Sequence, residues 1–317
     1  MTHLIVFIHG LMGSSRDFHA CAKLLNSPRK NSVRIYLARS CEHYFGTYDG
    51  IEAAGSRLAR EIIEAARSTA DFSRLSIVGH SLGGMFARQA LYVLYTMHKD
   101  FLETVQVLET FVTMATPHLG VRRPLRTAFN RLFQMTVSNL PGFRSGHELC
   151  MEETRPEGTS PLLVRMATED AYLDILKKFR RLVCYSNIYY DLQVPFSTGS
   201  IRSFNHYRRQ GVSTNGHPDF PCITAVSITA AASRGDELDV DIIEGGGSHE
   251  NTESAYNRDD RGAELREMLS ALGSLRWERY DVLYRNGVLA HEWIIGKNTY
   301  YGGRIDVPRH LAEVIFI

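Results

Sequence analysis

Short continuous apolar runs and segments of helical period alternate along the first two hundred residues. The continuous runs suit strands that are buried on both faces, as a parallel sheet requires. They occur at 4–8 (LIVFI), 33–38, 75–80, 110–117 and 181–190. Segments with apolar residues at helical spacing lie between them, at 16–26, 49–68 and 82–97. This alternation predicts an α/β fold whose sheet is doubly wound and mostly parallel.

The clearest of the predicted helices begins at a cap-like residue, Asp49. Apolar residues then recur on one helix face, at Ile51, Leu58, Ile62 and Ala65. We therefore expect an amphipathic helix that starts directly after Asp49 and packs against the sheet.

Two segments interrupt this alternation. Residues 121–178 have a helical pattern without a strand, which predicts a helical cap or lid insertion. Residues 203–275 are rich in loop-forming residues around one apolar run, CITAVSITA, and form a second insertion. A last strand is expected at 277–284 and a terminal helix near 306–315. The chain, 1–317, is thus predicted to be one domain with two insertions.

The first insertion contains an amphipathic stretch. One face gathers large apolar residues, and arginines fall largely elsewhere: Leu125, Phe129, Leu132 and Phe133 against Arg122, Arg126 and Arg131. A cap packed shut over the core would bury this face. If the face points outward instead, we expect residues 121–137 to contact an anionic lipid surface as a peripheral membrane element.

Composition and charge exclude several classes of protein. The net charge of +1 gives no electrostatic reason to expect a nucleic-acid partner. The five cysteines are scattered and form no C-x-x-C pair, which favours buried thiols in a reducing compartment over disulfides or a zinc site. No signal peptide is apparent, and no apolar run reaches the roughly 18 residues that a spanning helix needs. We therefore expect a cytoplasmic protein.

One serine lies between glycines at a predicted strand-to-helix corner, in the stretch Gly79-His80-Ser81-Leu82-Gly83. A G-x-S-x-G motif is weak evidence alone, but here a buried strand precedes it and a helix follows directly. That context is the one a nucleophile elbow requires. It would present the Ser81 hydroxyl at a helix N-terminus, where free N–H groups favour a developing oxyanion.

An early glycine-containing loop could complete such a site. In FIHGLMGS (7–14), Gly10 would let the loop pass close to the serine. The expected oxyanion-hole donors are the N–H of Leu11, with Met12 as second choice, and the N–H of Leu82. His9 is expected to brace the loop rather than to transfer protons.

A serine nucleophile also needs a base and an orienting carboxylate, which in this kind of fold follow in the order Ser, Asp, His. Asp191 directly follows the predicted strand at 181–190 and suits the acid. His291 follows the last strand by a short loop and is the preferred base, with His310 as the runner-up. The remaining later histidines lie in the loop-rich insertion, where a well-held base is not expected: His206, His217 and His249.

At this level of detail the chain resembles the ROG-type serine esterases, a lipase-like branch of the α/β-hydrolases. The resemblance rests on VFIHGLMG (6–13), LSIVGHSLGG (75–84), FVTMATPHLGV (111–121), YSNIYYDLQVPFSTGS (185–200) and VLAHEWII (288–295). GHSLGG is common to many lipases, whereas its combination with ATPHLG and YSNIYYDLQVPFSTGS is more specific. Residues 203–275 depart from the pattern expected of the family.

The resemblance implies an α/β-hydrolase fold and a catalytic triad on Ser81, Asp191 and His291. It also implies that Thr116, Pro117 and His118 open the cap and shape the pocket rim. The predicted function is hydrolysis of carboxylic esters, lipid esters above all, through an acyl-enzyme and without a cofactor or a metal. Acyl transfer or thioester hydrolysis by the same triad is one alternative, and a binding scaffold that retains the hydrolase fold is another.

Overall fold

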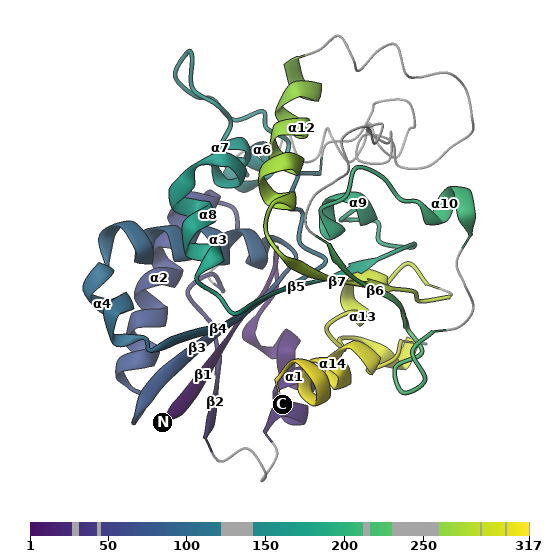
Figure 1. The fold of residues 1–317 in the computed structure, drawn as a ribbon, viewed down its shortest axis with the longest axis horizontal. Coiled ribbons are helices and arrows are strands. Elements are labelled where there is room, and N and C mark those ends of the chain that lie inside the picture. The colour runs from purple at the N-terminus through teal and green to yellow at the C-terminus, as the bar shows by residue number, and fades with distance from the viewer. Residues whose placement is uncertain are drawn as a thin grey trace.

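The computed structural model describes residues 1–26, 32–42, 46–121, 142–211, 216–229, 260–285, 287–301 and 303–316. These residues form a seven-stranded sheet in the order β2-β1-β3-β4-β5-β7-β6 (Figure 1). All neighbouring strands are parallel except β6 and β7, which pair antiparallel at one edge. The strands are β1 (Thr2–Ile8), β2 (Val33–Leu37), β3 (Phe72–His80), β4 (Val107–Met114), β5 (Arg181–Asn187), β6 (Ile223–Thr229) and β7 (Trp277–Val282).

Helices cover both faces of the sheet (Figure 1). On one face lie α2 (Ile51–Arg67), α3 (Leu82–Met97), α4 (Lys99–Thr104) and α8 (Asp170–Lys177). On the other lie α1 (His19–Leu25), α13 (Ala290–Trp293) and α14 (Asp306–His310). The short helices α6 (Arg144–Leu149), α7 (Leu162–Thr168) and α10 (Tyr207–Gln210) and the longer α12 (Asp260–Gly273) lie in the two predicted insertions, and the short α9 (Phe196–Ser200) lies between the insertions, after β5.

The continuous apolar runs are explained by burial on both sheet faces. Along β1, Leu4, Val6 and Ile8 enter the core beneath α2 and α3. Ile5 and Phe7 alternate with them and enter the core beneath α1 and α13. Because successive side chains of a strand point to opposite faces, a strand that serves two cores must be apolar throughout. The α/β-hydrolase class and the strands predicted in the first two hundred residues are confirmed.

Two elements of the second insertion were not predicted. The apolar run at 222–230 contains β6, which adds an antiparallel strand to the edge of the sheet. α12 then leads into β7 and lies against α7 (Figure 1). Alternating strands and crossover helices predict parallel strands, so this pattern did not indicate β6, which pairs antiparallel with β7.

The described part of the first insertion is helical, as α6, α7 and α8 show. α7 is fastened to the core by the buried Arg88 of α3, whose guanidinium donates to the carbonyl of Met166. The apolar stretch with Leu125, Phe129, Leu132 and Phe133 lies outside the described residues, so its role as a lid or membrane contact stays a prediction. In the described part of the chain, no helix has the length and apolar character needed to cross a membrane.

The start of α2 differs from the prediction that Asp49 caps it. Gly50 is the N-cap residue, and Asp49 instead pairs with Arg57 at 2.5 Å (Oδ2 to Nη1). The free N–H groups are satisfied from a distant segment: Ser145 Oγ accepts from Gly50 N at 3.1 Å, and Glu148 Oε2 accepts from Ile51 N at 2.6 Å. A tertiary contact therefore replaces the local cap.

This arrangement predicts a pH-dependent contribution of Glu148 to stability. Burial raises the pKa of its carboxyl from 4.5 to about 7, despite the opposing effects of Ile51 N–H and Arg144. Between pH 4.5 and 7 the folded state therefore retains a proton that the unfolded chain has lost, and stability falls as pH rises. Glu148→Gln should remove this pH dependence, which lowers the free energy of unfolding by about 3 kcal/mol across that pH range.

Urea unfolding of both proteins at several pH values measures this effect. Glu52→Gln is the matched control, because Glu52 lies beside the same Arg144 but has a side chain that is 41% exposed. The control should keep the wild-type slope. Parallel pH profiles for wild type and Glu148→Gln would contradict the assignment.

Candidate active site

Ser81 occupies a strained backbone position between β3 and α3. Its φ is 54° and its ψ is −132°, and residues other than glycine rarely adopt a positive φ. Its N–H donates to the carbonyl of Met114 at the end of β4, at 2.9 Å. Ser81 is also the N-cap residue of α3, so its side chain lies at the positive end of a long helix. These are the features of a nucleophile elbow.

Glycines make this corner possible by allowing backbones to meet. A Cβ on Gly83 would lie 2.4 Å from the carbonyl oxygens of Ile8 and His9, at the end of β1. A Cβ on Gly79 would lie 2.5 Å from the Cα of Gly84. The glycines of the motif are therefore required by the close approach of β1, β3 and α3.

The loop after β1 lies directly against the serine. A Cβ on Gly10 would lie 2.7 Å from Ser81 Cβ and 3.2 Å from its Oγ. His9 is buried and its Nδ1 donates to the Gly10 carbonyl at 3.0 Å, which matches the expected bracing role. The backbone of this loop is thereby held beside the hydroxyl.

The predicted oxyanion donors differ in their availability. The N–H of Met12 donates to Thr47 Oγ1 at 3.3 Å. Within the described ranges, the N–H groups of Leu11 and Leu82 have no hydrogen-bond acceptor. This favours Leu11 over Met12 as the partner of Leu82, and their role as an oxyanion hole stays a prediction.

Asp191 lies in a tight turn after β5, next to Tyr190, which has a φ of 64°. Its Oδ1 accepts from the backbone N–H of Gln193 at 3.0 Å and of Val194 at 2.8 Å, and its Oδ2 accepts from Asn187 Nδ2 at 2.8 Å. Burial acts to raise the pKa of this carboxyl, but His291 and these hydrogen bonds lower it below its ordinary value. The carboxylate is therefore kept ionised inside the protein.

His291 is the partner of this carboxylate. Its Nδ1 donates to Asp191 Oδ2 at 2.9 Å, and the two side chains are 5% and 2% exposed. Its ring centroid lies 4.7 Å from that of His80, the residue before Ser81. With Nδ1 on the carboxylate, Nε2 is the ring atom left to accept a proton. The structure thus joins the predicted acid and base and places them beside the elbow.

His310 has different surroundings. Its Nδ1 is hydrogen-bonded to the hydroxyl of Tyr185 at 2.7 Å, and its ring packs edge-on against Phe220 and Tyr280. Burial, with help from His217 and Arg181, lowers the pKa of His310 to about 4. No carboxylate among the described residues is hydrogen-bonded to it. It is therefore placed as a buried packing histidine rather than as an oriented base.

The predicted pocket-rim residues lie inside the domain. Thr116 is buried against Gly84, where a Cβ would lie 2.2 Å from Thr116 Oγ1. His118 is also buried, with its Nε2 3.0 Å from Thr113 Oγ1 and its ring edge-on to Trp277. Pro117 between them is buried too. The segment thus packs against the first turn of α3, directly after Ser81, and its part in shaping a pocket stays a prediction.

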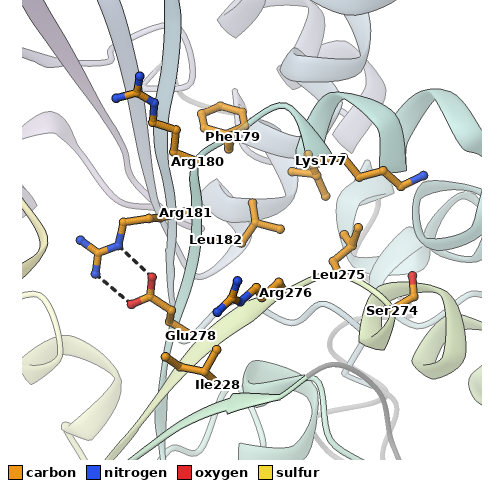
Figure 2. Close-up of a pocket in the computed structure, with 11 residues that line it drawn as sticks. Lys177, Phe179, Arg180, Arg181, Leu182, Ile228, Ser274, Leu275, Arg276 and Glu278 are labelled. Atoms are coloured by element: carbon orange, nitrogen blue, oxygen red, sulfur yellow. Dashed lines mark hydrogen bonds and ion pairs between the residues drawn. The ribbon is translucent and has the colours of Figure 1, made fainter.

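A cavity of about 360 Å³ contains none of these groups in its lining (Figure 2). It is lined at the amino ends of β5 and β7, where Arg181 and Glu278 form a two-pronged ion pair with both N–O distances 2.8 Å. Because Ser81 and Asp191 follow the carboxyl ends of β3 and β5, this cavity cannot hold a substrate of the elbow.

The sequence matches a family model described as "Putative serine esterase (DUF676)" over residues 1–204. The match spans more than half of the chain and includes the Gly10 loop, the elbow and Asp191. The chain belongs to this family. His291 lies outside the matched residues, so its assignment rests on the geometry described above.

Two proteins of a yeast are among the curated relatives. The chain is 28% identical over 206 residues to "Putative lipase ROG1" and 26% identical over 228 residues to "Putative lipase YDL109C", both of Saccharomyces cerevisiae. These alignments cover 63% and 70% of this chain but only 28% and 33% of the relatives. Among solved structures, the Bacillus licheniformis lipase BlEst2 is 18% identical with a TM-score of 0.37, over 59% of this chain and 66% of that one.

The contact between Gly10 and Ser81 generates a prediction about reactivity. Gly10→Ala should displace the serine side chain and slow its labelling by a fluorophosphonate at least about 100-fold, because reactivity depends on placement to within about 1 Å. Gly158→Ala is the control. Gly158 has a positive φ of 79°, which Gly10 does not, but nothing lies within 4 Å of its Cβ position.

Labelling rates are compared after thermal unfolding has shown that both variants are folded. The control should be labelled at the wild-type rate despite its backbone strain. Normal labelling of Gly10→Ala would mean that the loop does not lie against the serine.

Proposed function

We propose that the protein hydrolyses carboxylic esters through a Ser81–His291–Asp191 triad and an acyl-enzyme intermediate. One observation carries this proposal: the buried hydrogen bond between His291 and Asp191 lies beside a serine held at a strained strand-to-helix turn. Backbone strain and a buried charge both reduce stability. A binding scaffold gains nothing that would offset this loss, whereas a catalytic site does.

In the proposed first half-reaction, Ser81 Oγ attacks the ester carbonyl carbon while His291 Nε2 accepts the hydroxyl proton. Asp191 keeps His291 in the tautomer with hydrogen on Nδ1 and stabilises the imidazolium that forms. The N–H groups of Leu11 and Leu82 bind the tetrahedral oxyanion. The carbon–oxygen bond to the alcohol then breaks, and the alcohol leaves with the proton from His291.

In the second half-reaction a water molecule replaces the alcohol. The water oxygen attacks the acyl carbon while His291 accepts a proton from the water. The bond from the acyl carbon to Ser81 Oγ then breaks as His291 returns the proton to Oγ. The products are a carboxylic acid and an alcohol, and the enzyme is restored. These steps call for no metal ion and no organic cofactor.

We propose lipid esters as the substrate class, which the names of the yeast relatives support. A panel of esters with increasing acyl length, offered both below and above the concentration at which they aggregate, tests this extension. Preference for short soluble esters would overturn the lipid assignment and leave the esterase proposal intact. Ester formation with an added alcohol, at the expense of acid, would instead identify an acyltransferase.

Removal of the nucleophile should abolish both labelling and turnover. We expect Ser81→Ala to lose all fluorophosphonate labelling and to lower kcat for ester hydrolysis by about 10⁴-fold or more. Mass spectrometry of the labelled wild type should place the adduct on Ser81. A wild type that stays unlabelled, or an adduct on another residue, would refute the proposed nucleophile.

Paired histidine variants test the base. His291→Ala should lower kcat by about 10⁴-fold, because no group would then accept the serine proton. His310→Gln should keep near-wild-type kcat, since the amide can still form a hydrogen bond with the Tyr185 hydroxyl and preserve the packing site. Steady-state kinetics after a check of folding distinguish the two. The reverse pattern would transfer the base to His310.

A further inference from the structure

His80, the residue before the nucleophile, is bonded to the backbone of the proposed base. Its Nε2 lies 2.8 Å from the carbonyl oxygen of His291, and His80 is buried. A carbonyl oxygen can only accept, so Nε2 must carry the hydrogen. The His80 ring also packs edge-on against Phe18, with centroids 6.5 Å apart, which fixes it from the other side.

This bond supplies a partner that the local helix does not. α13 is only four residues long, and in a longer α-helix the N–H of Ile295 would donate to the carbonyl of His291. Here Ile295 N–H donates instead to the carbonyl of Glu292, at 3.3 Å. A buried carbonyl without a partner would be unfavourable, so His80 both satisfies this oxygen and fixes the position of the residue that carries it.

His80 is suited to this task because it stays neutral. Burial, followed by the proximity of His291, lowers the pKa of His80 well below its ordinary value. The charged groups that act on it are His291 and Lys297, which oppose its protonation, and Asp191, which favours it. A neutral His80 donates the hydrogen bond without adding a second positive charge beside the imidazolium that forms on His291.

We propose that His80 is a positioning residue for the base, and that it holds His291 in register with Ser81 through the hydrogen bond from its Nε2 to the His291 carbonyl. The inference rests on the proposed esterase function. His291 is then fixed at two points: its ring by Asp191 and its backbone by the covalent neighbour of the nucleophile. The distance between Ser81 and His291 is therefore set by one peptide bond and the hydrogen bond from His80.

A leucine and a glutamine substitution separate this role from packing. His80→Leu fills a similar volume without a donor, and we expect kcat to fall about 10- to 100-fold with KM within about 2-fold of wild type. The rate of fluorophosphonate labelling should fall by the same factor. His80→Gln keeps a side-chain N–H donor and should recover activity to within a few-fold, with an unchanged pH profile because His80 does not titrate in the working range.

His3→Leu is the matched control. His3 is another buried histidine, at the opposite end of the sheet on β1, and its Nε2 lies 2.8 Å from Ser76 Oγ. We expect it to lower thermal stability about as much as His80→Leu while kcat stays at the wild-type value. The comparison therefore shows whether loss of a buried histidine affects kcat as such.

Three results would overturn the proposal. Unchanged kcat in His80→Leu would show that the bond does not position the base. Equal loss of kcat in His80→Leu and His80→Gln would assign the effect to ring packing, and an equal loss in His3→Leu would assign it to stability. Failure of the esterase proposal is recognised separately, because the wild-type enzyme would then not be labelled at all.

Discussion

The close approach of backbones around Ser81 is the constraint on which the site depends. Ser81 can keep its positive φ only if β3 and α3 meet at a sharp corner. The end of β1 must also lie against the first turn of α3. Both contacts exclude side chains, so glycines occupy the positions where the chains meet. The same closeness brings the Gly10 loop to the hydroxyl. Strain in the backbone of Ser81 and the approach of the Gly10 loop to its hydroxyl thus have one cause.

Strand order converts this local corner into a site. β3, β4, β5 and β7 are successive neighbours in a parallel set, so the loops that follow them all lie at the carboxyl ends of these strands. Ser81, Asp191 and His291 each come from such a loop although they are far apart in sequence. The second insertion can separate acid from base because β7 returns beside β5 in register, with Ser186 opposite Asp281.

Most of the α/β core and the pairing of Asp191 with His291 could be predicted from the sequence, because buried parallel strands and the elbow leave strong local patterns. The cap of α2 could not be predicted, since Glu148 lies 97 positions from the Ile51 N–H that it accepts from. β6 was missed because an antiparallel edge strand follows no crossover. The support that Asn187 gives to Asp191, and His80 to His291, also left no pattern. Both depend on which polar groups the fold brings within hydrogen-bond distance.

His291 and His80 lie side by side at the carboxyl ends of the strands and carry their hydrogens on different ring nitrogens. His291 carries its hydrogen on Nδ1 because a carboxylate faces that atom, so Nε2 remains a proton acceptor. His80 carries its hydrogen on Nε2 because a carbonyl faces it. A carboxylate stabilises the cation that forms when a histidine accepts a proton, whereas burial beside a carbonyl and another histidine disfavours one. The fold therefore gives His291 the surroundings that the proposed base requires and leaves His80 a neutral donor.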